Sequence, residues 1–138
     1  MHMRKLAESK KRRAGAAAIE FAIVGPLFFL LVVGMIVYGG WLWMAHSVQS
    51  AVSEGARAAV AGLDQPERER LARETVDAQL KALGLRTADA VVSVRSDGTF
   101  FRVEAAYDAR RHPIMALSPL TVPPPSTIRR TAAIQVGE

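Results

Sequence analysis

The chain has 138 residues and no cysteine. This length allows one small folded domain beside a membrane segment, and the lack of cysteine excludes disulfides, thiolate catalysis and cysteine-bound metal. A net charge of +5 spread over a surface would favour a nucleic-acid partner. Here the excess charge lies at the N-terminus: residues 1–15 hold six basic side chains and one acidic, and residues 16–138 hold 12 of each. Such a basic cluster is typical of the cytoplasmic flank of a membrane span, so no nucleic-acid partner is expected.

An apolar run without charge extends from Phe21 to Ala45. About 20 helical residues cross the hydrocarbon core of a bilayer, so this run is long enough to span and too long for the apolar region of a cleaved secretory signal. Tyr38, Trp41 and Trp43 gather near its far end. Aromatic rings favour the membrane interface, which places the exit near residues 43–46. We therefore expect a single-pass protein of a bacterial inner membrane, with a cytoplasmic N-terminus and a periplasmic or extracellular C-terminal domain.

Two residues of this segment need a physical reason. Glu20 lies one turn inside the apolar stretch, where an ionised carboxylate must find a partner or reach the headgroups, because it costs about 2.5–3.5 kcal/mol at the bilayer centre. Pro26 follows Gly25 in the first half of the run. Proline removes one backbone hydrogen bond, so the pair is expected to bend or locally unwind the helix.

The basic leader ends in Gly15, and Glu20 is the fifth residue after it. The segment Lys10–Phe21, KKRRAGAAAIEF, resembles the leader of a type IV prepilin. More narrowly, Ala17–Phe28, AAIEFAIVGPLF, resembles the N-terminal signature of the TadE-like family, with a resemblance that covers residues 14 to about 60. Members are pseudopilins or minor pilins of the tight adherence, or Tad/Flp-type, pilus system, and they pair such a helix with a modest extracytoplasmic domain.

This resemblance implies a processing site and an assembly site. A prepilin peptidase would cut between Gly15 and Ala16 and leave a new α-amino group on Ala16. Glu20, followed by Phe21, would then be the assembly site, because its carboxylate can pair with the amine of a neighbouring subunit and neutralise two charges at the membrane edge. The implied partners are the membrane, the prepilin peptidase, other pilins or pseudopilins and the pilus assembly platform.

Two features depart from ordinary type IV pilins. Ala16 stands where phenylalanine is common at the first mature position, and the chain is far longer than a major Flp pilin. A filament-forming major subunit is therefore not expected.

Beyond the membrane, small residues recur every four positions on one helix face, where another backbone can approach closely. A helix over 16–61 would be about 70 Å long, and about half of it would project as a stalk. The stripe can pack against a second subunit or against the chain's own domain. The stripe consists of Ser47, Ala51, Gly55 and Ala59.

The predicted division of the chain is a leader (1–15), a membrane helix with stalk (16–62) and an extracytoplasmic domain (63–138).

A second helix is predicted over 65–83. Asp64 supplies an N-cap, Pro66 a first-turn proline and Glu67 the acidic member of a capping box, while Gly84 supplies a left-handed stop. Its apolar face comprises Ala72, Val76, Leu80 and Leu83.

Three strands follow in the sequence. Asp97-Gly98 separates 91–95 from 99–107 and predicts a tight hairpin. Alternation of apolar and polar residues predicts a third strand over 127–136. The fold class is therefore α+β: a long N-terminal helix, a second helix and a three-stranded antiparallel sheet. The residues expected to face the core are Val92, Val94, Phe101, Val103, Ala105, Ile128, Ala132, Ile134 and Val136.

The loop over 108–126 is stiff and apolar, with five prolines among residues 113–125. Such a loop either marks a partner surface or tucks under the sheet as a flap of the core. The sequence leaves both alternatives open.

No catalytic pattern is found in the sequence. His2, His46 and His112 are far apart, so neither a metal site nor a cofactor is expected, and the protein is not expected to be an enzyme. The leading interpretation is a pilin-like subunit processed after Gly15. The alternative is a permanently anchored bitopic membrane protein whose external domain binds a ligand or partner. A membrane-anchored enzyme is the weakest of the three.

Overall fold

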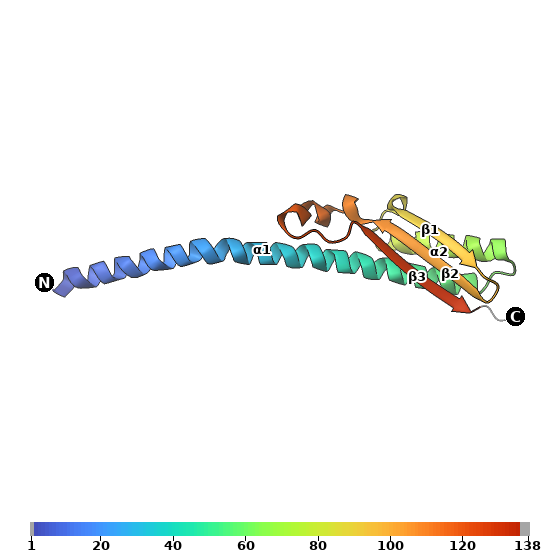
Figure 1. Cartoon of the computed structure of the whole chain (residues 1–138), viewed down its shortest axis with the longest axis horizontal. Helices are drawn as coiled ribbons and strands as arrows, with labels where there is room; N and C mark the ends of the chain where they lie inside the picture. Colours follow the sequence, from blue (N-terminus) through green and yellow to red (C-terminus); the bar gives the residue numbers. More distant parts are fainter. Residues whose placement is uncertain (1, 136–138) are drawn as a thin grey trace.

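Residues 2–135 are described in the computed structural model, with side chains from Gly15 onward. The described chain is α+β, which confirms the predicted fold class: a long helix, a second helix and an open antiparallel sheet, joined by short 3-10 helices (Figure 1). The elements are α1 (His2–Ala59), α2 (Gln65–Ala82), η1 (Thr87–Asp89), β1 (Ala90–Ser96), β2 (Phe100–Asp108), η2 (Ala109–Arg111), η3 (Pro113–Leu120) and β3 (Thr127–Gln135).

Helix α1 joins the leader, the apolar run and the stalk in one element of 58 residues. It begins before Ala16, the start considered from the sequence, because residues 2–14 contain no glycine or proline and are rich in strong helix formers. The helix passes through Gly25 and Pro26 without interruption and curves gently along its length (Figure 1). Local unwinding is thus absent, and a sharper bend at this pair in the bilayer stays a prediction.

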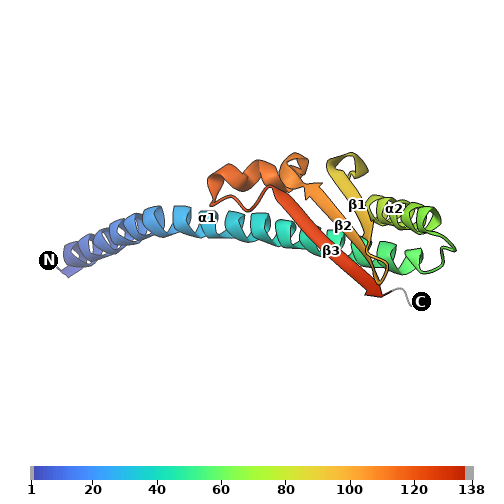
Figure 2. The same ribbon diagram turned by 45° about the vertical axis from the view of Figure 1, so that its right-hand side comes forward.

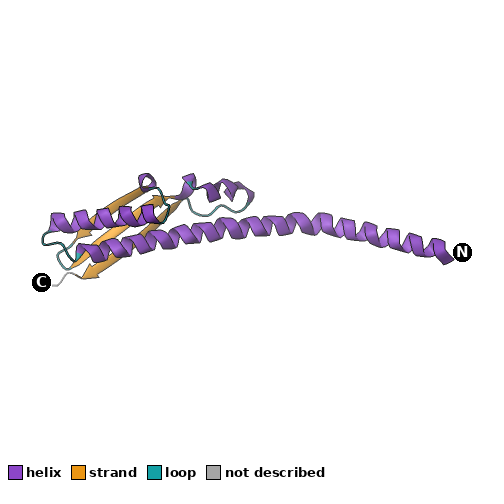
Figure 3. Ribbon diagram, turned by 180° about the vertical axis from the view of Figure 1, so that it is seen from behind, coloured by secondary structure: helices purple, strands orange, loops and turns teal. Residues whose placement is uncertain are grey.

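The three strands lie in the order β1-β2-β3 and pair antiparallel. Figure 3 shows the C-terminal half of α1 and the whole of α2 side by side on one face of this sheet. The predicted hairpin forms about Gly98, which has a positive φ of 90°. The predicted third strand is also confirmed, ending at Gln135, whereas Val136 lies outside the described residues.

The core lies between the sheet and the two helices. Phe101, Val103 and Ala105 of β2 are buried, and Val92 and Val94 of β1 are half-buried against them. On β3, Ile128 is buried, and Ala132 and Ile134 pack against the same cluster. Helix α1 completes the core with Met44, Val48 and Val52. The end of the apolar run and the segment after it therefore serve as the core helix of the domain.

Helix α2 has the capping expected from its sequence. The Asp64 carboxylate accepts a hydrogen bond from the backbone N–H of Glu67 at 2.8 Å, and the Glu67 carboxylate accepts one from the N–H of Leu63 at 2.8 Å. Gly84, at φ 75°, ends the helix. Ala72, Val76 and Leu80 are buried as predicted, whereas Leu83 is only half-buried and Leu85 takes its place. The difference arises because the chain leaves the helical path at Leu83.

Candidate membrane anchor and assembly surface

The N-terminal half of α1 extends well beyond the folded domain (Figures 1 and 2). Large apolar side chains on it are exposed all round, including Phe21 at 76%, Leu27 at 67% and Phe28 at 64%. Within the described residues, Gly15–Ala59 is the one helical segment long and apolar enough to cross a membrane. A helix that is apolar all round requires a nonaqueous environment, so this one has the character of a single-pass membrane anchor.

The residues expected to carry processing and assembly lie on this projecting part. Gly15, Ala16 and Glu20 are exposed, and a Cβ atom added at Gly15 would meet nothing within 4 Å. The ring of Phe21 lies over Gly25 on the next turn, 3.6 Å from the position of an added Cβ. The side chains of Ala16 and Glu20 are thus accessible in the isolated chain, whereas the Gly15–Ala16 peptide bond lies within helix α1.

The small-residue stripe lies inside the domain. Ala51, Gly55 and Ala59 are fully buried and Ser47 nearly so. A Cβ atom at Gly55 would lie 2.6 Å from Cγ2 of Val76 and 2.9 Å from the carbonyl oxygen of Ala72. In this structure α2 therefore occupies the stripe at Gly55, which is the intramolecular alternative that the sequence left open.

The model of the TadE-like protein family matches residues 15–57.

This match confirms the resemblance seen in the sequence and covers the membrane segment and stalk of α1. It begins at the glycine that ends the basic leader and stops before α2. Comparison with curated proteins and with solved structures gives no match. The TadE-like segment associates the chain with the membrane and with components of the Tad pilus.

A proline-rich segment lies along the TadE-like helix. We call residues 113–125 the flap; it comprises η3 and the chain that returns to β3, and it points back towards the N-terminus of α1 (Figure 2). A Cβ atom at Gly40 would lie 2.6 Å from Cδ1 of Ile114. The absence of a side chain at Gly40 therefore allows the flap to pack closely on α1. The sequence did not reveal that the flap would pack beside residues of the predicted span.

Two aromatic side chains attach the flap to α1. The Tyr38 hydroxyl donates a hydrogen bond to the Val122 carbonyl at 3.0 Å, and the Trp41 indole N–H donates one to the Pro125 carbonyl at 2.8 Å. One side of the flap thus packs on protein, with Met115 in the core. Its other side remains exposed at Leu120 and Val122. One side of the flap thus belongs to the core, and the other is an exposed apolar surface, so each of the two alternatives left open by the sequence describes one side.

Replacing Trp41 with phenylalanine is expected to lower the free energy of unfolding by about 1 kcal/mol, because the Pro125 carbonyl loses its donor while most of the ring packing is kept. Thermal unfolding of the full chain in detergent measures this. Trp43→Phe is the matched control, since no hydrogen bond from the Trp43 indole occurs within the described residues. Equal destabilisation by both substitutions would contradict the role given to the Trp41 bond.

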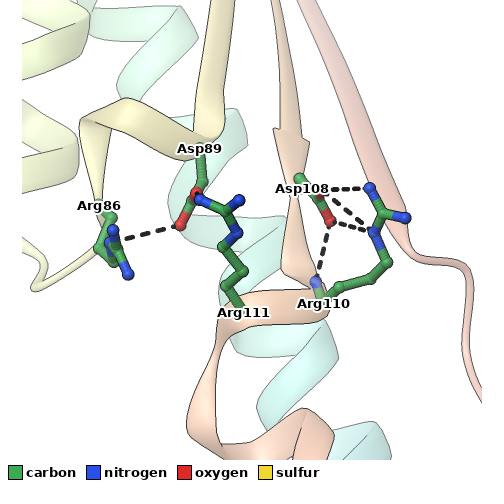
Figure 4. Close-up of polar contacts among 5 residues, drawn as sticks. All are labelled: Arg86, Asp89, Asp108, Arg110 and Arg111. Carbon is green, nitrogen blue, oxygen red and sulfur yellow. Dashed lines mark hydrogen bonds and ion pairs between the residues drawn. The ribbon is translucent and has the colours of Figure 1, made fainter.

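Ion pairs hold the base of the flap (Figure 4). The ends of the loop are joined by a hydrogen bond from the Ala109 N–H to the Ser126 carbonyl at 2.8 Å. The Arg110 guanidinium contacts the Asp108 carboxylate at 2.6 Å and lowers its pKa to about 2. This carboxylate remains ionised at neutral pH, and the contact is lost only as the pH falls through that value.

Asp89 is the buried acidic residue at this base. Its carboxylate lies 3.6 Å from Nε of Arg86 and 3.5 Å from Nη1 of Arg111 (Figure 4). Two guanidinium groups thus compensate the charge, and they link η1, ahead of β1, to η2, after β2.

The described residues do not form an evident catalytic or metal site. No group of three or more His, Cys, Asp or Glu side chains among them could hold a metal ion. A shallow hollow at the junction of α2 and β1 is lined by Arg73, Asp77 and small or apolar residues. The Arg73 guanidinium in it already donates to the Val92 carbonyl. The TadE-like match indicates a pilus-associated protein, and the absence of enzymatic activity stays a prediction.

Proposed function

We propose that this protein is a pilin-like subunit, a pseudopilin or minor pilin, that takes part in assembling a Tad/Flp-type pilus for surface adherence. The observation that carries the proposal is the TadE-like match, which begins at Gly15. The exposed apolar half of α1 and the folded domain at its far end support it, because a subunit that enters a pilus needs a helix able to exchange lipid for neighbouring helices.

The first step of the proposed function is removal of the leader. A prepilin peptidase at the cytoplasmic membrane face cuts between Gly15 and Ala16, with the basic leader held on the cytoplasmic side. The folded domain then lies on the periplasmic or extracellular side. Gly15 and Ala16 are exposed on α1, and the cut requires the helix to unwind locally at the bond between them.

The second step is assembly. Cleavage creates an α-amino group on Ala16, and the Glu20 carboxylate of an adjacent subunit pairs with it. Both charges lie at the edge of the apolar layer, where neutralisation stabilises the assembled state. The protein acts in this scheme as a structural part, without catalysis and without a cofactor.

Identification of the N-terminal residue tests the proposal. The protein is purified from its native host membrane, and its intact mass and terminal peptide are measured for the natural chain and for Gly15→Ala. We expect Ala16 as the terminus of the natural chain and an intact leader in the variant. Gly39→Ala is the matched control, because it makes the same change on the same helix where an added Cβ meets nothing within 4 Å.

The opposite result has a definite meaning. An intact leader in the natural chain, in cells that assemble pili, overturns the pilin-like function. The protein would then be a permanently anchored bitopic membrane protein whose external domain binds a partner.

A further inference from the structure

The contacts between the flap and α1 form a ladder along the helix. Thr121 lies against Gly34, Val122 bonds to Tyr38, and Pro125 bonds to Trp41. At the base, the His112 ring lies 6.1 Å from the Trp43 ring. The tip of the flap therefore lies beside Gly34 and its base beside Trp43.

The rise of the helix per residue gives the depth of the flap in the membrane. Gly34 follows Glu20 by 14 residues, about 21 Å of helix, and Trp43 lies about 35 Å from Glu20. The hydrocarbon core is about 30 Å thick. If Glu20 lies at its inner edge, Trp43 lies just outside the outer edge and the tip of the flap lies about 9 Å below it.

A shallower position of the domain is disfavoured by charge. If Gly34 lay at the outer edge of the hydrocarbon core, about residue 14 would lie at its inner edge, and Glu20 would be about 9 Å inside the hydrocarbon. A carboxylate in the hydrocarbon is costly, whereas the charge-free run from Phe21 to Ala45 allows the deeper position without burying any charge.

The chemistry of the flap suits the membrane interface. No Asp, Glu, Lys or Arg occurs from His112 to Ile128, and Leu117, Leu120 and Val122 are exposed. Nonhelical backbone is costly in lipid because its polar groups need partners. Five prolines in the flap carry no N–H group, and two of its carbonyls accept bonds from Tyr38 and Trp41.

Arginines flank this uncharged segment on both sides. Arg110 and Arg111 precede it, and Arg129 and Arg130 follow it. The side chains of Arg110, Arg111 and Arg129 are 72%, 67% and 73% exposed. These three guanidinium groups pair with the carboxylates of Asp108, Asp89 and Glu104 respectively. An exposed guanidinium has further N–H donors, with which it can also contact an anionic headgroup at the water-facing base of the flap.

We propose that the flap is an interfacial wedge that enters the outer leaflet of the membrane crossed by α1. Leu117, Leu120 and Val122 contact lipid, as do Met35 and Leu42, which are exposed apolar side chains on the part of α1 beside the flap. The wedge rests on α1 crossing a membrane, as the proposed function does, but not on cleavage at Gly15 or on pilus assembly. It fixes the depth of the helix, because the flap and α1 are joined by hydrogen bonds.

Single-cysteine variants test the wedge, since the natural chain has no cysteine. Leu120→Cys and Val122→Cys are made in the full chain, reconstituted in nanodiscs of phosphatidylcholine and phosphatidylglycerol, and reacted with a membrane-impermeant maleimide. We expect them to react at least tenfold more slowly than Leu63→Cys. Leu63 is the matched control, a 92% exposed leucine in the turn between α1 and α2.

Quenching by lipid separates burial in lipid from burial in protein. The same cysteines carry an environment-sensitive fluorophore, and the nanodiscs contain lipids spin-labelled near the headgroup or deep in the acyl chain. We expect the shallow label to quench the fluorophore at residues 120 and 122 more strongly than the deep label, and the deep label to quench it at Phe29→Cys.

Two outcomes would overturn the wedge. Labelling at 120 and 122 as fast as at 63 would place the flap in water. Protection from maleimide without quenching by lipid would mean that protein, such as a second copy of this chain, covers it. Neither outcome concerns the leader, so the wedge and the proposed function fail separately.

Discussion

Replacing Gly55 with leucine is expected to destabilise the folded domain by about 3 kcal/mol, the upper end of the usual cost of overpacking a core. The Cβ atom of any side chain at this position would lie 2.9 Å from the Ala72 carbonyl oxygen, which is backbone. The same atom would lie 2.6 Å from Cγ2 of Val76. Neither neighbour is the end of a long flexible side chain, so α2 must move away from α1 as a unit and lose its packing.

Unfolding is followed by the fluorescence of Trp41 and Trp43, which lie against the flap and its base. A loss of about 3 kcal/mol corresponds to a fall in Tm of roughly 12–24 °C for a domain of this size. Gly39→Leu is the matched control, because it adds the same atoms to α1 where nothing lies within 4 Å of the new Cβ. A Tm for Gly55→Leu within 2 °C of that of Gly39→Leu, about half the shift for 1 kcal/mol, would show that α2 does not pack on this glycine.

The elements that could be predicted from sequence are those whose signals are local. The Asp64 cap, the Gly84 stop and the Asp97-Gly98 turn each depend on residues within one turn of one another, and the structure has all three. Alternation along β2 placed Phe101 and Val103 correctly for the same reason, because a strand against one core shows its pattern directly.

The position of the flap could not be predicted, and the reason is physical. Val33 and Val37 are buried, whereas Met35 and Ile36 on the same turns are exposed. Lipid and protein are equally apolar neighbours, so a membrane helix carries no polar face to mark which side packs on protein. The contacts that seat the flap also join residues 84 positions apart in the chain. Such pairings leave no local pattern in a single sequence.

The assembly site differs from the local elements and from the flap, because its expected partner is another subunit. Gly15 and Glu20 were singled out by their spacing and by the resemblance of their surroundings to TadE-like proteins. The structure leaves them exposed on α1. Their roles therefore rest on the TadE-like match and on the chemistry of the charges.

Glu20→Gln is expected to reduce the incorporation of the protein into pili at least tenfold while leaving its membrane level and its cleavage after Gly15 unchanged. The amide keeps the shape of the side chain but removes the charge that opposes the Ala16 amine, which with an ordinary pKa of about 7.7–8.0 is mostly protonated at neutral pH. An uncompensated ammonium group at the edge of the apolar layer then opposes assembly. Immunoblots of sheared pili and of membranes measure the two pools.

Glu54→Gln is the matched control on the same helix. Glu54 is paired with Arg57 at 3.1 Å and lies beyond the apolar run, so its loss is expected to leave incorporation unchanged. Glu20→Asp keeps the charge on a shorter side chain and is expected to retain part of the incorporation. Incorporation of Glu20→Gln at the natural level would remove the charge pair from the account of assembly.

The charge pair can form in two ways, and assembly depends on the difference. Glu20 lies four residues after Ala16, so in a single subunit both groups share one helix face and the carboxylate can contact its own amine. An exposed pair of this kind contributes only about 0.3–0.5 kcal/mol. In a stack of staggered subunits, each carboxylate leaves its own amine and pairs with the amine of a neighbour. Less water surrounds the pair there, so the attraction is stronger.

Equal amounts of a Glu20→Gln chain and a natural chain in one cell should therefore yield pili enriched in the natural chain. Equal incorporation of the two would mean that no charge pair between subunits favours assembly.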